Sequence, residues 1–464
     1  MSEVNETWTG VSLFSGAGIG DLGLRAGGVE FIALAELDPP RADLARRNFP
    51  EARVFASDLQ QEWGPICDFV EARLDDLGRG LDLLACTPPC QGMSKSGQGK
   101  LLRNIREGKR PRLDPRNRLI LAGLDVIKRL QPRWVVFENV TEMQHTLIED
   151  RSGEIRPILE IVAEELQGYA GWAHAVEFAD YGIPQRRQRL ITVLSREQHC
   201  HAAGSAAGGF VPAPSHSNRN DGLQMWVSVD EALASFPALD AASPESASSP
   251  NVPFHRVPVL DARKYAWISH TPPGASAFDN QCVNPSCRFD ANPTHGNARV
   301  GGINQSKKDT PINCLKCSAP LPRPTTVLED GSERLMSGYT SAYKRMRAEL
   351  PAPAITRNLS YPCSDHKVHP TQNRVLSLAE AFVLQTLDRY PYTWEREPET
   401  GSRRAAADTL VRLVLGESVP PAILQTHVHL LQQLETGKEV AAAGGTPLAD
   451  QKTPWSDQEQ LALV

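Results

Sequence analysis

The chain has 464 residues, a formal net charge of −6 and 41% hydrophobic residues. This length is too great for one ordinary core and indicates about three structural units at most. The negative charge excludes a globally basic nucleic-acid binder, so any such role needs a locally basic surface. The first residues carry no signal-peptide pattern and no apolar stretch reaches membrane-spanning length, so we expect a cytoplasmic protein without membrane contact. Its nine cysteines are therefore expected to be reduced thiols.

Short apolar runs alternate with helical patterns in the first part of the chain. Strands are predicted at 11–14, 31–35, 53–56, 81–87, 134–137 and 189–194. Helices are predicted between them at 20–26, 40–48, 118–130 and 155–166. The alternation predicts an α/β fold with a doubly wound, mostly parallel sheet.

The texture changes after residue 195. Residues 196–255 are rich in Ala, Ser, Pro, Gly and His with little periodicity, which is typical of a loop-rich second domain. Helical periodicity returns at 374–387 and 405–434. We therefore expect a catalytic domain at 1–195 that is completed by 374–436, a second domain at 196–373, and a flexible tail at 437–464.

A glycine-rich loop follows the first predicted strand and opens a helix. Gly16, Gly18 and Gly20 permit a tight turn and a close backbone approach to a ligand, although their spacing differs from the dinucleotide fingerprint. Glu36 ends the second strand, where a carboxylate can accept hydrogen bonds from ribose hydroxyls. Asp58 follows the third strand and could bind an adenine amino group. Together they favour an adenosine-bearing cofactor without phosphates over a purely structural turn.

Cys90 follows an apolar run that ends at Pro88 and Pro89. The prolines stop the strand and fix the turn. Ligands bind in loops beyond the carboxyl ends of strands in open α/β sheets, so a cysteine here is interpreted as a nucleophile. Cys86 lies inside the apolar run and is interpreted as a core residue.

Three other segments belong with this cysteine. Glu138 ends the predicted strand at 134–137; on its own it would be read as a surface carboxylate beside a loop. Arg187 and Arg189 share one side of a segment that enters an apolar strand, although a solvated charge run is the usual interpretation of such a pattern. The loop at 95–118 holds nine Lys or Arg residues against two acids, and could close over a polyanion.

Six motifs in this order resemble the signature motifs of DNA cytosine-5 methyltransferases. They are FSGAGIG at 14–20, PPCQ at 88–91, ENV at 138–140, QRRQR at 185–189, RVLSLAE at 374–380 and GESVPP at 416–421. The resemblance covers about residues 10–195 and 335–430. The variable region between them sits where that family keeps its target recognition domain.

The resemblance implies a Rossmann-like methyltransferase sheet and a specific reaction. The thiolate of Cys90 would attack C6 of a flipped-out cytosine, whose C5 then takes a methyl group from S-adenosylmethionine. Glu138 would contact N3 and the exocyclic amine, while Arg187 and Arg189 would hold O2. The family usually has Asn where this chain has Glu417, so either the closure of the cofactor pocket or the affinity for the cofactor is expected to differ. The implied cofactor-binding residues are Phe14, Gly16, Gly18, Gly20, Glu36, Leu37, Asp58 and Pro89.

Four cysteines in the variable region form two pairs. Cys282 and Cys287 are separated by four residues, Cys314 and Cys317 by two, and 26 residues lie between the pairs. The pattern predicts a closed tetrahedral zinc site of structural character. Two disulfides and unligated thiols are the alternatives.

The resemblance favours a modification enzyme of a restriction–modification or anti-phage defence system, with double-stranded DNA as substrate. We expect a monomer, with defence-system proteins as candidate partners. The alternatives are a cytosine-5 methyltransferase acting on transfer RNA and a catalytically silent DNA-binding regulator. The long, cysteine-bearing variable region favours DNA, and intact Cys90, Glu138 and Arg187 disfavour a silent relative.

Overall fold

The structure is a computed structural model that describes residues 7–89, 93, 113–295, 297–300, 303–306, 310–336, 341–364, 366–438 and 440–450. Cys90 and most of the basic loop at 95–118 lie outside these ranges, as do the side chains of residues 297–306. No helix in the described part of the chain is long and apolar enough to cross a membrane.

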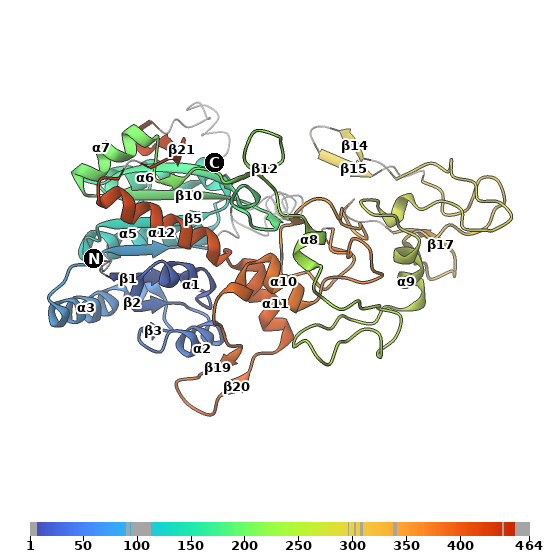
Figure 1. The fold of residues 1–464 in the computed structure, drawn as a ribbon, viewed down its shortest axis with the longest axis horizontal. Helices are drawn as coiled ribbons and strands as arrows, with labels where there is room; N and C mark the ends of the chain where they lie inside the picture. The colour runs from blue at the N-terminus through green and yellow to red at the C-terminus, as the bar shows by residue number, and fades with distance from the viewer. Residues whose placement is uncertain are drawn as a thin grey trace.

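An eight-stranded sheet has the strand order β22-β8-β10-β5-β4-β1-β2-β3 (Figure 1). The strands are β1 Trp8–Leu13, β2 Val29–Ala35, β3 Arg53–Phe55, β4 Leu83–Cys86, β5 Trp134–Asn139, β8 Ala170–Glu177, β10 Gln188–Ser195 and β22 Thr446–Pro447. The first five are parallel to one another, whereas β10, β8 and β22 each pair antiparallel with their neighbours. The predicted α/β fold with a mostly parallel sheet is confirmed.

Helices cover both faces of the sheet, which gives the doubly wound arrangement. One hydrophobic core lies under α1 Ile19–Ala26, α2 Pro39–Asn48 and α12 Pro421–Glu435. The other lies under α3 Leu59–Leu77, α5 Leu119–Leu130 and α6 Ile158–Glu165. Helix α1 packs so closely on α12 that a Cβ at Gly23 would collide with the backbone of Pro421.

Several elements differ from the sequence-based prediction. The sequence pattern does not predict helix α3, because Gly64 and Pro65 interrupt its apolar periodicity, and its backbone is non-helical at Glu62. The single helical pattern at 405–434 forms two helices, α11 Asp408–Glu417 and α12, because the chain turns at Pro420. The antiparallel strand β8 is also absent from the prediction.

The large core extends beyond the predicted domain boundary at residue 195. Helix α7 Gln198–Ala207 packs against α12, and Phe210 is fully buried in the first core.

Part of the predicted flexible tail is also ordered. Strand β22 extends the sheet by pairing with β8, and Leu448 is buried in the second core, because an apolar side chain and a free sheet edge give this segment a place to pack.

The region between the two parts of the large core is loop-rich, with small apolar clusters of its own. Hydrogen bonds from a buried guanidinium also hold this region together. Arg345 donates to the backbone carbonyls of Ile268, Thr271, His369 and Gln372. The remaining helices and strands are β6 Leu147–Glu149, β7 Ile155–Pro157, β9 Gln185–Arg186, β11 Val211–Pro212, β12 His216–Ser217, β13 Gln224–Met225, α8 Val229–Leu233, α9 Ala262–Ser269, β14 Asn297–Val300, β15 Ile303–Ser306, β16 Thr325–Val327, β17 Glu333–Leu335, β18 Ala352–Pro353, α10 Leu378–Leu384, β19 Glu395–Arg396, β20 Arg404–Ala405 and β21 Ala442–Ala443.

Candidate active site and cysteine cluster

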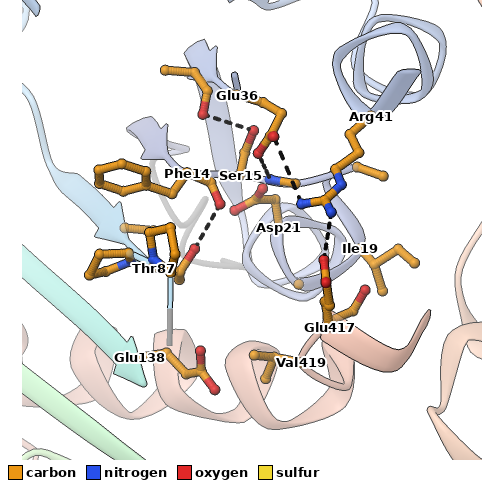
Figure 2. Close-up of a pocket in the computed structure, with 18 of the residues that line it drawn as sticks. Phe14, Ser15, Ile19, Asp21, Glu36, Arg41, Thr87, Glu138, Glu417 and Val419 are labelled. Carbon is orange, nitrogen blue, oxygen red and sulfur yellow. Dashed lines mark hydrogen bonds and ion pairs between the residues drawn. The ribbon is translucent and has the colours of Figure 1, made fainter. Parts of the chain in front are cut away.

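A cavity of about 620 Å³ lies beyond the carboxyl ends of β1, β2, β4 and β5 (Figure 2). The order of the sheet reverses between β1 and β4, which is where ligands bind in open α/β sheets. Of the residues predicted from sequence, the cavity is lined by Phe14, Gly16, Gly20, Glu36, Leu37, Asp58, Pro89, Glu138 and Arg189. Gly18 and Arg187 are not among its lining residues, and Cys90 lies outside the described residues.

The glycine-rich loop turns through left-handed backbone conformations. Phe14, Gly16 and Gly18 have φ of 59°, 57° and 76°. Such a conformation is strained for Phe14, whose carbonyl accepts a hydrogen bond of 3.0 Å from the hydroxyl of Thr87. A Cβ at Gly18 would collide with Phe49, so this glycine shapes the loop and its packing rather than the cavity wall.

Glu36 lies at the end of β2 and is 8% exposed. Its two oxygens accept backbone hydrogen bonds from Gly16 (3.0 Å) and Asp38 (2.9 Å). Burial raises the pKa of Glu36, opposed by these N–H groups and by the charge of Arg41. The carboxylate is thus fixed at the cavity wall with further acceptor capacity for a ligand.

Two further predicted residues, Leu37 and Asp58, also line the cavity. Leu37 is 64% exposed, so this lining residue offers an apolar surface that the rest of the protein does not cover. Asp58 begins α3 and accepts a hydrogen bond of 3.0 Å from the backbone of Gln60. Asp is a preferred N-cap residue, which accounts for part of its use at this position. The other carboxylate oxygen of Asp58 accepts a hydrogen bond of 3.2 Å from the side-chain amide of Gln61.

Glu138 is 8% exposed at the end of β5, and its Oε1 lies 2.9 Å from Nε of Arg189. No hydrogen bond of acceptable geometry reaches that buried oxygen among the described residues. Burial raises the pKa of Glu138, opposed by the charges of Arg189 and Arg187. The cavity therefore holds a carboxyl group that is driven toward its neutral form and has hydrogen-bonding capacity to spare.

Arg187 and Arg189 share one side of the chain, as the alternation predicts, but their positions differ. The guanidinium of Arg187 is buried and donates to the backbone carbonyls of Ile355 (3.0 Å) and Gly416 (3.2 Å). Arg187, which lies between β9 and β10, thus links this segment to the end of α11, and it acts on Glu138 through its charge.

The sequence-based set misses several cavity residues. Asp21, Arg41, Thr87, Arg116, Asn139, Ser418 and Val419 also line it. Burial raises the pKa of Asp21 to about 7, opposed by a hydrogen bond to Ser12 and the charge of Arg25. The position of Asp21 directly after the glycine-rich loop could have predicted that it lines the cavity. No local sequence pattern predicts this for Arg41, which contacts Glu417 from the other end of the chain.

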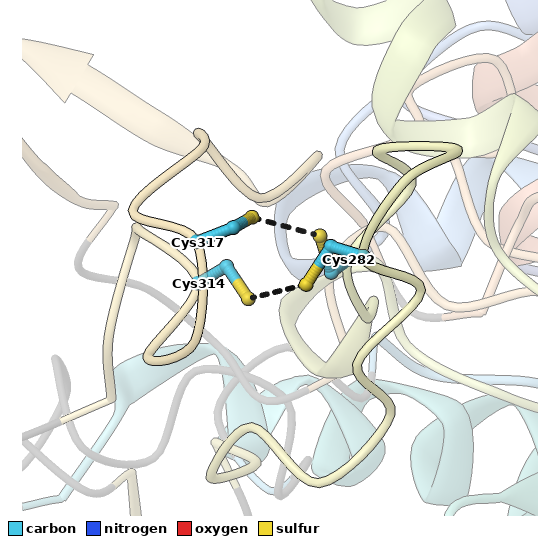
Figure 3. A group of neighbouring side chains, drawn as sticks. Cys282, Cys314 and Cys317 are labelled. Atoms are coloured by element: carbon cyan, nitrogen blue, oxygen red, sulfur yellow. Dashed lines mark hydrogen bonds between the residues drawn. The ribbon is translucent and has the colours of Figure 1, made fainter.

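The four cysteines of the variable region meet in space (Figure 3). Their sulfurs all lie within 4.8 Å of one another, with 3.6 Å between Cys282 and Cys317 and 3.9 Å between Cys287 and Cys314. A tetrahedron with Zn–S bonds of about 2.3 Å has S···S edges of about 3.8 Å. A disulfide would bring two of the sulfurs to about 2.05 Å. The spacing fits a four-thiolate metal site.

Polar groups orient this cysteine cluster. The side-chain amide of Asn292 donates to Sγ of Cys314 at 3.8 Å, and its oxygen accepts a hydrogen bond of 2.9 Å from the backbone of Leu315. Arg323 is 1% exposed and holds the backbone on both sides of the cluster. Its guanidinium donates to the carbonyls of Asn280, Pro293 and Pro311. The two cysteine pairs are therefore held together by protein contacts as well as by any metal.

The sheet order and the cavity beyond β1 define a Rossmann-like methyltransferase fold. Residues 8–223 match the family of C-5 cytosine-specific DNA methylases. The Type II methyltransferase M1.HgaI of Avibacterium volantium is 27% identical over 429 residues, covering 90% of this chain and 96% of its own length. The Type II methyltransferase M1.HphI of Haemophilus parahaemolyticus is 32% identical over 236 residues, covering 50% of this chain and 54% of its own.

Among solved structures, a DNMT2 variant from Spodoptera frugiperda aligns with 92% of this chain and 99% of its own, at 12% identity and a TM-score of 0.47. Residues 8–223 of the chain are thus similar to the C-5 cytosine-specific DNA methylase family, and the relatives compared are Type II methyltransferases. Use of S-adenosylmethionine and action on DNA are expected for this family.

Proposed function

We propose that this protein methylates C5 of cytosine in double-stranded DNA, with S-adenosylmethionine held in the cavity beyond β1. The observation that carries the proposal is a cavity in which a nucleoside-type wall, formed by Glu36 and Asp58, faces the buried carboxyl of Glu138. One ligand would bring a transferable group from the first side to a base held at the second.

The residues of the cavity fit S-adenosylmethionine. Glu36 has acceptor capacity for the ribose hydroxyls, and Asp58, which lines the same cavity, is assigned to the adenine amino group. Phe14 and Leu37 offer apolar surface to the adenine ring. The lining contains more acids than bases, which favours a cationic ligand over one with phosphates. When bound, the cofactor supplies an electrophilic methyl group.

Glu138 is proposed to bind the cytosine ring. N3 of cytosine is a hydrogen-bond acceptor and its exocyclic amine is a donor, so a neutral carboxyl group complements both. Burial raises the pKa of Glu138 toward that form, and Oε1, which lies 2.9 Å from Nε of Arg189 without acceptable hydrogen-bond geometry, is proposed to accept from the amine. As negative charge develops on the ring during attack at C6, the hydrogen bond to N3 strengthens. Arg189 lies beside it and is assigned to O2.

Cys90, which follows Pro89 of the cavity wall, is proposed as the nucleophile. Its thiolate forms a bond to C6, which makes C5 electron-rich enough to take the methyl group. Loss of the C5 proton then restores the double bond and expels the thiolate. The cytosine must leave the duplex to reach this site, at a cost of a few kcal/mol.

The loop-rich region is proposed as the target recognition domain, with a structural zinc ion held by Cys282, Cys287, Cys314 and Cys317. The support is the tetrahedral spacing of the sulfurs and the small size of the apolar cluster around them. Four protein ligands leave no open position for chemistry. The ion would therefore serve folding of this region.

Purified protein is expected to contain about one zinc ion per chain, as a closed site of four cysteines requires. Cys314→Ser removes one ligand, so we expect loss of the metal and of tight DNA binding, with retention of S-adenosylmethionine binding in the separate cavity. Metal analysis and calorimetric titration measure the two effects. Cys363→Ser is the matched control, because Cys363 is exposed and outside the cluster. Fewer than about one zinc ion per two chains in the wild type contradicts the site.

The names of the relatives support a biological role. Both M1.HgaI and M1.HphI are Type II methyltransferases. We infer that this protein is the modification enzyme of a restriction–modification system, active as a cytoplasmic monomer. The test is to supply labelled S-adenosylmethionine with double-stranded DNA or with transfer RNA. Label in DNA supports the proposal, label in RNA alone supports the transfer-RNA enzyme, and label in neither supports a silent DNA-binding regulator.

A further inference from the structure

An ion pair lies in the wall of the cofactor cavity. Arg41, in the first turns of α2, places Nη2 2.8 Å from Oε2 of Glu417, the last residue of α11. Both side chains line the cavity (Figure 2) and both are partly exposed. The pair therefore joins two segments from opposite ends of the chain at the wall of the cavity.

Arg41 also faces a second carboxylate, Glu36. Its Nη1 lies 4.0 Å from Oε1 of Glu36, beyond hydrogen-bonding distance, and its Nε lies 3.9 Å from Oδ1 of Asp38. Among these three acids, Glu417 alone is in direct contact with the guanidinium. Arg41 is thus shared unequally, and a shift of about 1 Å would bring it into hydrogen-bond contact with Glu36.

The acceptor capacity of Glu36 is limited. A carboxylate offers about four lone-pair sites, and two are used by the N–H groups of Gly16 and Asp38. The remaining sites are those assigned to the ribose hydroxyls. A guanidinium in direct contact with Glu36 would occupy the same sites and would form a charge-assisted bond that a neutral hydroxyl cannot easily displace.

We propose that Glu417 holds Arg41 away from Glu36 and so keeps the ribose-binding carboxylate open to the cofactor. The inference rests on the proposed function, because it assigns Glu36 to the ribose. Glu417 is a positioning residue in this scheme: it acts on the cofactor through Arg41. The negative charge of Glu417 attracts the guanidinium of Arg41 in competition with Glu36. The neutral Asn that the family usually has at this position would not compete in this way.

Glu417→Ala should release Arg41 to Glu36. We expect the dissociation constant for S-adenosylmethionine, measured by calorimetry, to rise about tenfold, the scale of one competing ion pair at a partly buried site. The KM for the cofactor should rise with it, with kcat at saturating cofactor unchanged. The double variant Arg41→Ala with Glu417→Ala removes the competitor as well, so its affinity should return to within about threefold of the wild type.

Glu399→Ala is the matched control. Glu399 pairs with Arg46 of the same helix at 2.7 Å, also from the C-terminal part of the chain, but it does not line the cavity. We expect its affinity for the cofactor to equal that of the wild type, and thermal unfolding of each variant to exclude a general loss of structure.

Two results overturn the inference while leaving the proposed function intact. One is an unchanged affinity for S-adenosylmethionine in Glu417→Ala. The other is a double variant that binds the cofactor as weakly as Glu417→Ala, which would mean that the ion pair only holds the two segments of the cavity wall together. A wild-type protein that does not bind S-adenosylmethionine overturns the proposed function, and this inference with it.

Discussion

Cys90→Ala is expected to abolish methyl transfer to DNA while leaving the affinity for S-adenosylmethionine unchanged. Without the sulfur there is no bond to C6, and C5 stays too poor in electrons to attack the methyl group. Loss of a covalent nucleophile costs at least about 10⁴-fold in kcat. The residues proposed to hold the cofactor come from other elements, chiefly the glycine-rich loop, Glu36 and Asp58, so binding should survive.

Transfer of labelled methyl groups and calorimetric binding measure the two quantities in parallel. DNA that carries 5-fluorocytosine adds a direct test, because fluorine at C5 cannot leave as a proton and the covalent adduct should persist. The wild type is expected to form this adduct, and the alanine variant to form none. Methylation that survives in Cys90→Ala would sink the assignment of the nucleophile.

Glu138→Ala is expected to lower kcat by about 10²- to 10³-fold, the usual cost of removing a donor aimed at developing charge. Glu138→Gln keeps an N–H donor and a carbonyl acceptor but has no titrating proton, so its main effect should be on the pH dependence. Burial raises the pKa of Glu138, so the neutral carboxyl is fully populated below its ordinary pKa and is lost as the pH rises through the raised value. Wild-type activity should therefore fall as the pH rises through the raised pKa of Glu138, and the glutamine variant should lack that fall.

The same titration affects stability, with a sign that can be worked out. A carboxyl with a raised pKa binds its proton more tightly in the folded state, so the stability of the wild type relative to Glu138→Gln should decrease as the pH rises through the raised pKa. Thermal unfolding of both proteins across the pH range measures this difference. A constant difference, together with identical alkaline limbs in the rate profiles, would show that Glu138 does not titrate in the folded protein.

The sequence is sufficient to predict the fold class and most of the cavity wall, because both depend on local pattern. The ends of parallel strands meet at one edge of a sheet, so the order of Phe14, Glu36, Asp58 and Glu138 along the chain already places them near one another. Asp21 is within reach of the same reasoning.

The rest depends on contacts that no local pattern records. Alternation puts Arg187 and Arg189 on one side, but only tertiary packing decides that Arg187 donates to backbone carbonyls while Arg189 forms an ion pair with Glu138. The pairing of Arg41 with Glu417 joins distant segments. Helix α3 is obscured by two residues of low helix propensity near its start, and the burial of its apolar face in the second core overrides that propensity.

The close packing of α1 on α12 has a consequence for synthesis of the protein. Residues Val414, Glu417, Val419 and Leu424 line the cavity, and α12 packs on α1, the helix that follows the glycine-rich loop. A nascent chain that ends before residue 414 would contain the five parallel strands but lack these four lining residues. Long-range contacts of this kind also slow folding. The lining of the cofactor site is therefore complete only after the segment at 414–424 has left the ribosome, late in translation.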